Sequence, residues 1–120
     1  MSDDAMYRTE FLRRSQNLKH VGESFSGKPI QATNPLCGDE QQIDIAIENG
    51  KISKIKYKPK GCLVSKVSTD IVIDAILNKS VDEAQKLTIA DIEATMGIKL
   101  TPSRRKCASL GLNNIQGYLK

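Results

Sequence analysis

The sequence has no tryptophan, only two phenylalanines and three tyrosines, and a single histidine. It lacks any apolar run close to the ~20 residues that a membrane helix needs. Its first residues, Met1-Ser2-Asp3-Asp4, are acidic where a secretory signal is basic. These absences argue against secretion and membrane insertion, so we expect a cytoplasmic protein. Few aromatic rings are available for base stacking, which argues against single-stranded nucleic-acid binding.

Proline and glycine are also sparse, with four and eight residues respectively, and they form no stretch that would separate two domains. Apolar residues make up 39% of the 120 residues, which is enough for one buried core. We therefore expect residues 1–120 to form a single domain. The 18 basic and 14 acidic residues leave a net charge of +4, which favours acidic partners without indicating nucleic acid.

An alternating pattern predicts a β-hairpin in the middle of the chain. Isoleucines alternate with other residues over residues 43–47, as in a half-buried strand. The dipeptide Asn49-Gly50 favours a type I′ turn. In the second strand Ile52 is out of step with Ile55 and Tyr57, which predicts a β-bulge. A short extended segment, residues 30–32, precedes the hairpin.

Helical periods dominate the rest of the sequence. Residues 3–18 have a weak amphipathic pattern, and further helices are expected from residue 64 to about 78, from Ser80, from Thr88 to Gly97, and from Pro102 onward. In the first of these later helices the predicted apolar face is Val64, Val67, Ile71 and Ala75, with Ser65, Ser68, Asp70 and Asp74 around it. This order predicts an α+β fold: a small antiparallel sheet of about three strands, with helices packed on one face.

Three cysteines cannot form a complete set of disulfides, so their positions matter more than their pairing. Cys37 and Cys62 flank the hairpin, whose two ends return to one edge of the sheet, and Cys107 opens the last helix. A helix docked on that edge can bring the three together. Helix N-termini favour the thiolate form at Cys62 and Cys107, and three cations precede Cys107. Asp39 can offer a carboxylate beside Cys37. The alternative is that the cysteines are isolated small core residues.

Four segments together resemble one known family. They are Asn-Pro-x-Cys-Gly-Asp at residues 34–39, Gly-Cys-x-x-Ser-x-x-Ser at 61–68, Lys-Ser-x-x-Glu-Ala at 79–84, and Cys107. This pattern resembles the IscU/NifU-N-terminal/SufU family of iron–sulfur cluster assembly scaffolds, from about Tyr7 to the end of the chain. The resemblance implies an IscU-like fold.

The resemblance also implies a ligand set and a function. Cys37, Asp39, Cys62 and Cys107 match the family's cluster ligands, and each cysteine is a candidate acceptor of persulfide sulfur. In the family, a cysteine desulfurase supplies the sulfur, a transient 2Fe–2S cluster forms, and the cluster passes to apo iron–sulfur proteins. We therefore expect a scaffold that is not an enzyme, and either a monomer or a weak homo-oligomer.

Two departures from the family pattern bear on its partners. IscU members have His before the third cysteine, whereas this chain has Lys106, which is more similar to SufU members. A protonated lysine cannot bind metal but can assist the thiolate of Cys107. The segment that IscU presents to its Hsp70 chaperone is altered here, with Arg104 in place of a lysine. Arg104 and Lys106 are therefore auxiliary residues, and dependence on an Hsp70 chaperone is in doubt.

Two other functions remain as alternatives. Three cysteines and one aspartate can equally hold Zn²⁺, which would suit a zinc-dependent sulfurtransferase partner of a desulfurase, as in SufU. That subfamily also carries an insertion before its third cysteine, which the 45-residue spacing from Cys62 to Cys107 lacks. The second alternative is a basic binding module built on the strand lysines 51, 54, 56, 58 and 60, although such runs are usually a solvated strand face. Ser65 and Ser68 are expected to be packing residues and not nucleophiles.

Overall fold

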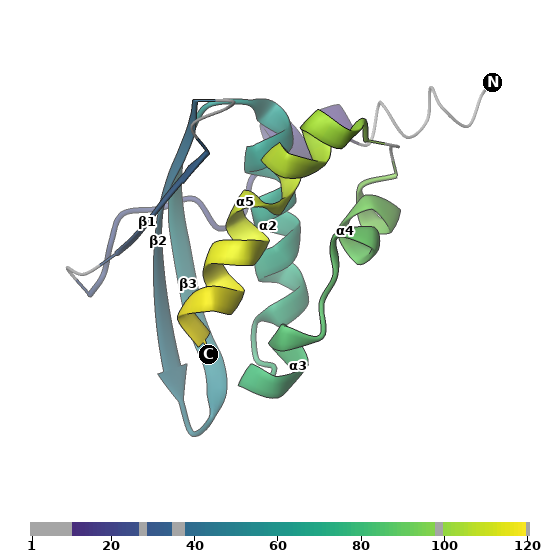
Figure 1. The fold of residues 1–120 in the computed structure, drawn as a ribbon. Coiled ribbons are helices and arrows are strands. Elements are labelled where there is room, and N and C mark those ends of the chain that lie inside the picture. Colours follow the sequence, from purple (N-terminus) through teal and green to yellow (C-terminus); the bar gives the residue numbers. More distant parts are fainter. Residues whose placement is uncertain (1–10, 27–28, 35–37, 98–99, 120) are drawn as a thin grey trace.

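The computed structural model describes residues 11–26, 29–34, 38–97 and 100–119 (Figure 1). Its elements are β1 (Ile30–Asn34), β2 (Asp39–Glu48), β3 (Lys51–Lys60), α2 (Leu63–Ile76), α3 (Val81–Gln85), α4 (Ile89–Met96) and α5 (Pro102–Leu119). The strands form one antiparallel sheet in the order β1-β2-β3. Figure 1 shows α2 and α5 against the same face of the sheet, with α4 on their far side. The predicted α+β arrangement is confirmed.

The hairpin has the turn and the bulge that its sequence predicts. Asn49 and Gly50 both have positive φ, at 55° and 76°. The register shifts between Ala46 and Ile47, because Ala46 pairs with Lys54 whereas Ile47 pairs with Ile52. The expectation that Ile47 continues the buried face is wrong: it is 43% exposed, and it lies beyond the register shift.

The N-terminal helix ends two residues earlier than its pattern predicts. Within the described residues it runs from Phe11 to Gln16, and the expected residues 3–10 lie outside the described part of the chain. The side-chain amide of Asn17 donates to the carbonyl of Arg13 at 2.8 Å, and its backbone N–H donates to Arg14. These bonds satisfy carbonyls at the helix end, so Leu18 lies beyond the helix.

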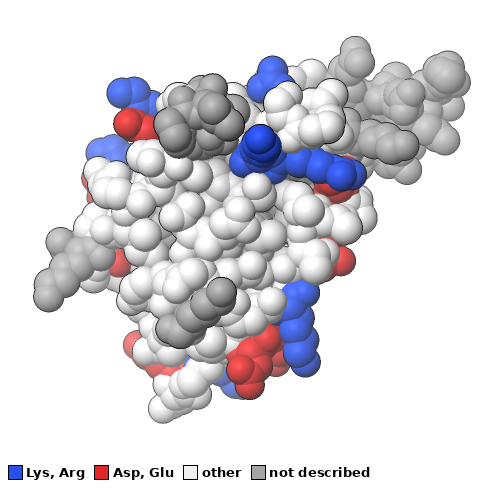
Figure 2. All heavy atoms as spheres, in the orientation of Figure 1, with Lys and Arg blue, Asp and Glu red and all other residues white. Residues whose placement is uncertain are grey.

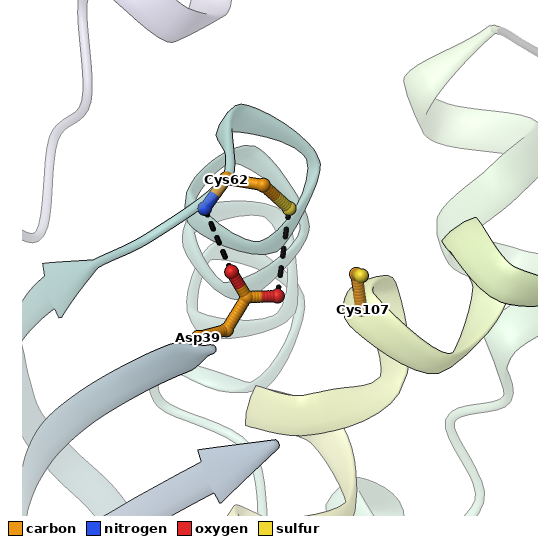
Figure 3. Close-up of side chains that lie close together, drawn as sticks. All are labelled: Asp39, Cys62 and Cys107. Carbon is orange, nitrogen blue, oxygen red and sulfur yellow. Dashed lines mark hydrogen bonds between the residues drawn. The ribbon is translucent and has the colours of Figure 1, made fainter. Parts of the chain in front are cut away.

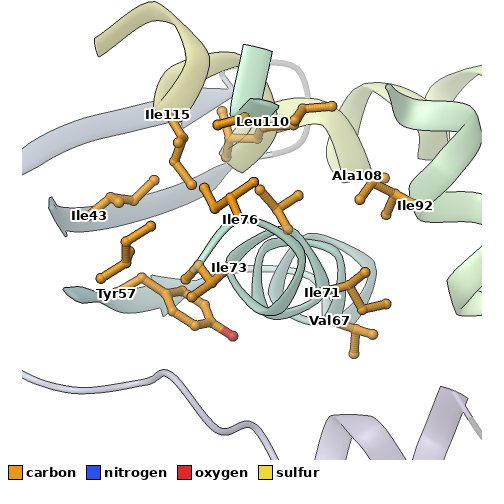
Figure 4. Packing of buried hydrophobic residues seen from close by; sticks show 14 of the residues in the cluster. Ile43, Tyr57, Val67, Ile71, Ile73, Ile76, Ile92, Ala108, Leu110 and Ile115 are labelled. Atoms are coloured by element: carbon orange, nitrogen blue, oxygen red, sulfur yellow. The ribbon is translucent and has the colours of Figure 1, made fainter. Parts of the chain in front are cut away.

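Helix α2 is buried on more sides than an amphipathic helix would be. Val67 and Ile71 are buried as expected, but Ala75 is exposed. Asp70 was expected beside the apolar face and is instead buried, and Ser65 and Ser68, which were expected to be packing residues, are buried as well. The reason is that α2 contacts β3, α3, α4 and α5 together. Figure 4 shows its side chains among those of the sheet and of α5.

The later helices begin at the predicted residues, and α4 also ends where its sequence predicts. Ser80 caps α3, Thr88 and Asp91 form a capping box at α4, and Gly97 ends α4 with φ 78°. Helix α5 begins at Pro102, with the hydroxyl of Thr101 accepting the N–H of Arg104. No helix in the described part of the chain is long and apolar enough to span a bilayer.

The outer face of the sheet is partly covered by the segment before β1. The carboxylate of Asp44 accepts hydrogen bonds from the backbone N–H groups of Phe25 and Ser26 and from the hydroxyls of Ser24 and Ser26. Burial alone would raise the pKa of Asp44, but these hydrogen bonds outweigh it and lower the pKa to about 2. Lys54 stacks over Phe25, 4.4 Å from the ring centre, so one strand lysine has a local structural role.

Helices α2 and α5 approach each other closely at Gly111. A Cβ on this residue would overlap the hydroxyl of Thr69 and lie 2.9 Å from the Thr69 methyl group. Nearby, the hydroxyl of Ser68 donates to the carbonyl of Ala108. Cys107 precedes Gly111 by one helical turn and therefore lies on the same side of α5. The contact at Gly111 thus places Cys107 relative to α2.

Two glycine substitutions in α5 test this contact, and only one of them should destabilise the protein. Gly111→Ala should lower the free energy of unfolding by about 1–3 kcal/mol, because the methyl group overpacks the interface with Thr69. Gly117→Ala, whose Cβ would meet nothing within 4 Å, should leave it unchanged or raise it by up to about 1 kcal/mol through helix propensity. Urea denaturation of the metal-free proteins measures both. Equal effects of the two substitutions would contradict the close approach.

Candidate metal centre

Asp39 is the first residue of β2 and lies opposite Asn34 at the end of β1. Its side chain is fully buried. Its Oδ1 accepts the backbone N–H of Cys62 at 2.7 Å. This hydrogen bond joins the start of β2 to the residue that caps α2. A charge-assisted hydrogen bond of this length holds the carboxylate at the start of α2.

Gly61 makes room for that carboxylate. Its φ is 124°, a conformation that residues with a side chain rarely adopt. A Cβ at this position would overlap Oδ1 of Asp39 and lie 2.9 Å from its Cα. The glycine of the Gly-Cys motif is therefore required both by the turn from β3 into α2 and by the packing of Asp39 beneath it.

Cys62 and Cys107 lie beside the same carboxylate (Figure 3). Cys62 caps α2, and its sulfur accepts the N–H of Ser65 at 3.5 Å. The Cys62 thiol also lies 3.5 Å from Oδ2 of Asp39. One ligand atom from each of Asp39, Cys62 and Cys107 lies within 4.8 Å of the other two. Three elements that are distant in sequence thus bring two sulfurs and one carboxylate together.

The burial of these groups differs. Cys107 is 2% exposed and Asp39 is fully buried, whereas Cys62 is only half-buried. The group formed by Asp39, Cys62 and Cys107 is therefore more accessible from the side of Cys62. Cys37, the fourth predicted ligand, lies outside the described residues.

A buried amide network, which the sequence did not lead us to expect, supports the start of α2. Gln41 is 1% exposed; its Nε2 donates to the hydroxyl of Ser65 at 2.9 Å, and its Oε1 accepts the hydroxyl of Thr69 at 3.0 Å. This network joins β2 to α2 directly below Asp39 and Cys62. Gln41 lies two residues before Ile43 and four before Ile45, so the period-two pattern of a strand could have identified it as inward-facing. Ser65 and Ser68 are held in hydrogen bonds within the core, which agrees with their expected packing role.

The auxiliary residues lie at the surface. Arg104 and Lys106 are exposed on the first turns of α5. Arg105 pairs with Glu93 of α4, with Nε 2.6 Å from Oε1. Figure 2 shows Lys and Arg side chains over the part of this face where α5 begins, above a largely uncharged middle. The surface near Cys107 is thus positively charged, which suits anionic groups.

The chemistry of the donor set fits a metal. Two thiols and a carboxylate, deprotonated, are ligands for zinc or for iron in iron–sulfur chemistry. Isolated core cysteines usually pack among apolar side chains, whereas Cys62 and Cys107 lie beside the buried carboxylate of Asp39. The arrangement in Figure 3 therefore favours a metal centre over scattered packing residues.

Comparison with known proteins gives consistent matches along the chain. The chain is 27% identical to the iron–sulfur cluster assembly scaffold protein IscU of Streptococcus pyogenes, over 96% of this chain and 83% of the relative. It is 24% identical to the zinc-dependent sulfurtransferase SufU of Bacillus subtilis, over 89% of this chain and 84% of the relative. Among solved structures, SufU from the thermophile Fervidobacterium islandicum superposes with a TM-score of 0.77 at 24% identity, covering 92% of this chain and 94% of the other.

The family model of the NifU-like N-terminal domain matches residues 6–120. This match spans all three strands and every helix described above, together with the residues of the candidate metal centre. The chain belongs to the NifU-like N-terminal domain family.

Proposed function

We propose that this protein is an iron–sulfur cluster assembly scaffold. It receives sulfur from a cysteine desulfurase, builds a transient 2Fe–2S cluster on Cys37, Asp39, Cys62 and Cys107, and transfers the cluster to apo-proteins. The observation that carries the proposal is the convergence of Asp39, Cys62 and Cys107 within 4.8 Å. The likeness to IscU of Streptococcus pyogenes over nearly the whole chain supports it.

Sulfur transfer needs a thiolate that a partner's persulfide can reach. A scaffold thiolate attacks the outer sulfur of the desulfurase persulfide, the S–S bond breaks, and the desulfurase cysteine leaves as a thiolate. Reduction of the transferred sulfur to sulfide then takes two electrons from an external reductant. Cys107, Cys37 and Cys62 are all candidate acceptors. Of the two in the described part of the chain, Cys62 is the more accessible.

The mixed ligand set suits a temporary holder of a cluster. Thiolates are soft ligands that match iron–sulfur chemistry. The carboxylate of Asp39 is a harder ligand and binds a cluster iron more weakly, so it is the point at which release begins. Asp39 can return to its hydrogen bonds with Cys62 when the cluster leaves.

A zinc-dependent sulfurtransferase is the second candidate function. Lys106 and the likeness to SufU of Bacillus subtilis favour it. Asp39, Cys62, Cys107 and Cys37 would then hold Zn²⁺, which would keep the cysteines as thiolates. The short spacing between Cys62 and Cys107 favours the scaffold.

The partners follow from the proposed function. They are a cysteine desulfurase and apo iron–sulfur proteins, in the cytoplasm, with the protein acting as a carrier and not as an enzyme. The cations Arg104 and Lys106 assist the thiolate of Cys107 or a bound sulfide. Because the segment around Arg104 differs from the chaperone-binding segment of IscU, the proposal includes no Hsp70 partner. A monomer or a weak homo-oligomer is sufficient.

Anaerobic reconstitution distinguishes the two functions. The chain is incubated with ferrous iron, cysteine, a reductant and a catalytic amount of cysteine desulfurase. The scaffold function predicts visible absorption and circular dichroism of a 2Fe–2S cluster, which then appears on an added apo-ferredoxin. The Cys62→Ser variant is the control and should fail to hold the cluster. Absence of a cluster, combined with strong stimulation of the desulfurase by the zinc form, would favour the sulfurtransferase instead.

Replacing the carboxylate should make the cluster persist longer. Asp39→Ala removes the weak ligand, and the half-life for transfer to an apo-ferredoxin should rise by about tenfold, which corresponds to ~1.4 kcal/mol of activation free energy. The change in visible circular dichroism as the cluster moves to the ferredoxin measures this. Thermal unfolding of the metal-free variant checks that the fold survives the loss of a buried group. A folded variant that loses its cluster faster than the parent would contradict the role of Asp39 in release.

A further inference from the structure

A second group of metal-binding side chains lies away from the cysteines. His20, Asp70 and Asp74 each offer a ligand atom within 4.8 Å of the other two. Asp70 and Asp74 are one turn apart on α2 and share a side of the helix. His20 comes from the segment that follows the N-terminal helix. The proposed function uses none of these three residues.

The backbone around His20 is held in place by β3. The N–H of Tyr57 donates to the carbonyl of His20 at 3.1 Å, and the N–H of Gly22 donates to the carbonyl of Tyr57 at 3.0 Å. The N–H of His20 itself donates to Oδ2 of Asp70 at 3.0 Å. The segment thus extends the sheet by a short parallel bridge. The imidazole is therefore positioned over α2 by fixed backbone contacts.

Asp70 has one carboxylate oxygen available. The residue is 6% exposed, and Oδ2 accepts both the N–H of His20 and the hydroxyl of Tyr57 at 3.0 Å. Burial and the adjacent Asp70 carboxylate raise the pKa of Tyr57 above its ordinary value, so this hydroxyl remains a donor. Among the described residues, no hydrogen bond reaches Oδ1. Oδ1 therefore keeps its lone pairs available for a water molecule or a cation.

The third ligand, Asp74, has a partly exposed side chain. Oδ1 of Asp74 lies 2.6 Å from Nε2 of His20, and its side chain is 37% exposed. Lys19 is a weak competitor, with its ammonium 3.7 Å from Oδ2 of Asp74 and its side chain 68% exposed. A cation that binds here replaces the hydrogen bond between His20 and Asp74 and competes with Lys19 for the Asp74 carboxylate.

We propose that His20, Asp70 and Asp74 form a second metal site that binds a hydrated divalent first-row transition metal. One imidazole and two carboxylates neutralise the charge of such an ion and leave positions for water. The imidazole favours Zn²⁺, Fe²⁺ or Co²⁺ over Mg²⁺ and Ca²⁺, which prefer all-oxygen sites.

The two sites are separate along one helix. Asp70 and Asp74 follow Cys62 by 8 and 12 residues, which is roughly 12 and 18 Å along the axis of α2. No ligand is shared between them. The first site is built on thiolates and the second on nitrogen and oxygen, so each selects metals by a different chemistry. The proposal does not depend on the proposed function.

Paramagnetic NMR with Co²⁺ as the probe tests the second site. The ¹⁵N-labelled chain is first loaded with one equivalent of Zn²⁺, which the thiolates bind in preference. Titration with Co²⁺ should then shift or broaden the amide signals of residues 19–22 and 69–75 before others, and saturate below about 1 mM. Near-ultraviolet absorption shows independently whether Co²⁺ has entered a thiolate site, because a sulfur-to-cobalt charge-transfer band then appears. The residue-specific readout does not require the first site to work.

Three variants sharpen the test. Asp74→Asn changes an exposed side chain and should weaken Co²⁺ binding by at least about tenfold. Lys19→Gln removes the competing cation and should tighten binding. Asp82→Asn alters an exposed carboxylate at the start of α3 and should leave binding unchanged.

Three results would overturn the proposal. They are no saturation up to about 1 mM Co²⁺, paramagnetic effects centred on acidic residues elsewhere, and equal affinity of the Asp74→Asn variant and the parent. His20→Gln gives a second measure, because its backbone bonds to Tyr57 and Asp70 remain while the metal-binding nitrogen is lost. A parent-like affinity in this variant would likewise rule out the site.

Discussion

The candidate metal centre depends on how closely α5 approaches α2. Gly111 packs against Thr69 without a side chain between them, and Ser68 bonds the backbone of α5 at Ala108. This contact places the sulfur of Cys107 at the end of α2, where Cys62 and Asp39 already meet. A wider separation between the helices would leave two ligands on one side and a buried thiol on the other. The geometry of the centre is therefore a property of helix packing as much as of the ligands.

The same helix organises two kinds of coordination chemistry. At its N-terminus, the glycine turn at Gly61 and the cap at Cys62 collect sulfur and one carboxylate, which suits a soft metal cargo. Two to three turns later, Asp70 and Asp74 face the imidazole of His20, which suits a harder divalent ion. The buried network of Gln41, between these regions, ties α2 to the sheet. A rigid helix can thus carry both sites without mixing their ligands.

Much of the fold and part of the site were predictable because their signals are local. The Asn49-Gly50 turn, the bulge before Ile55 and the caps of the later helices each depend on a few neighbouring residues. The burial of Asp70 was not predictable, because its contacts with His20 and Tyr57 are decided by packing with distant elements. Ile47 shows the limit of a period-two pattern, which a register shift interrupts. The proximity of Cys62 and Cys107 was predicted from a helix docked on the edge of the sheet. The contact at Gly111 that fixes it was not predicted, because it depends on packing between distant residues.

The central claim is that three sulfurs and one oxygen hold a single metal. Zinc K-edge X-ray absorption on the chain loaded with one equivalent of Zn²⁺ measures this directly. The account predicts three sulfur neighbours at about 2.3 Å and one oxygen at about 2.0–2.2 Å, with one sulfur fewer in the Cys37→Ser variant. A first shell of only nitrogen and oxygen, or two sulfurs that persist unchanged in that variant, would contradict it.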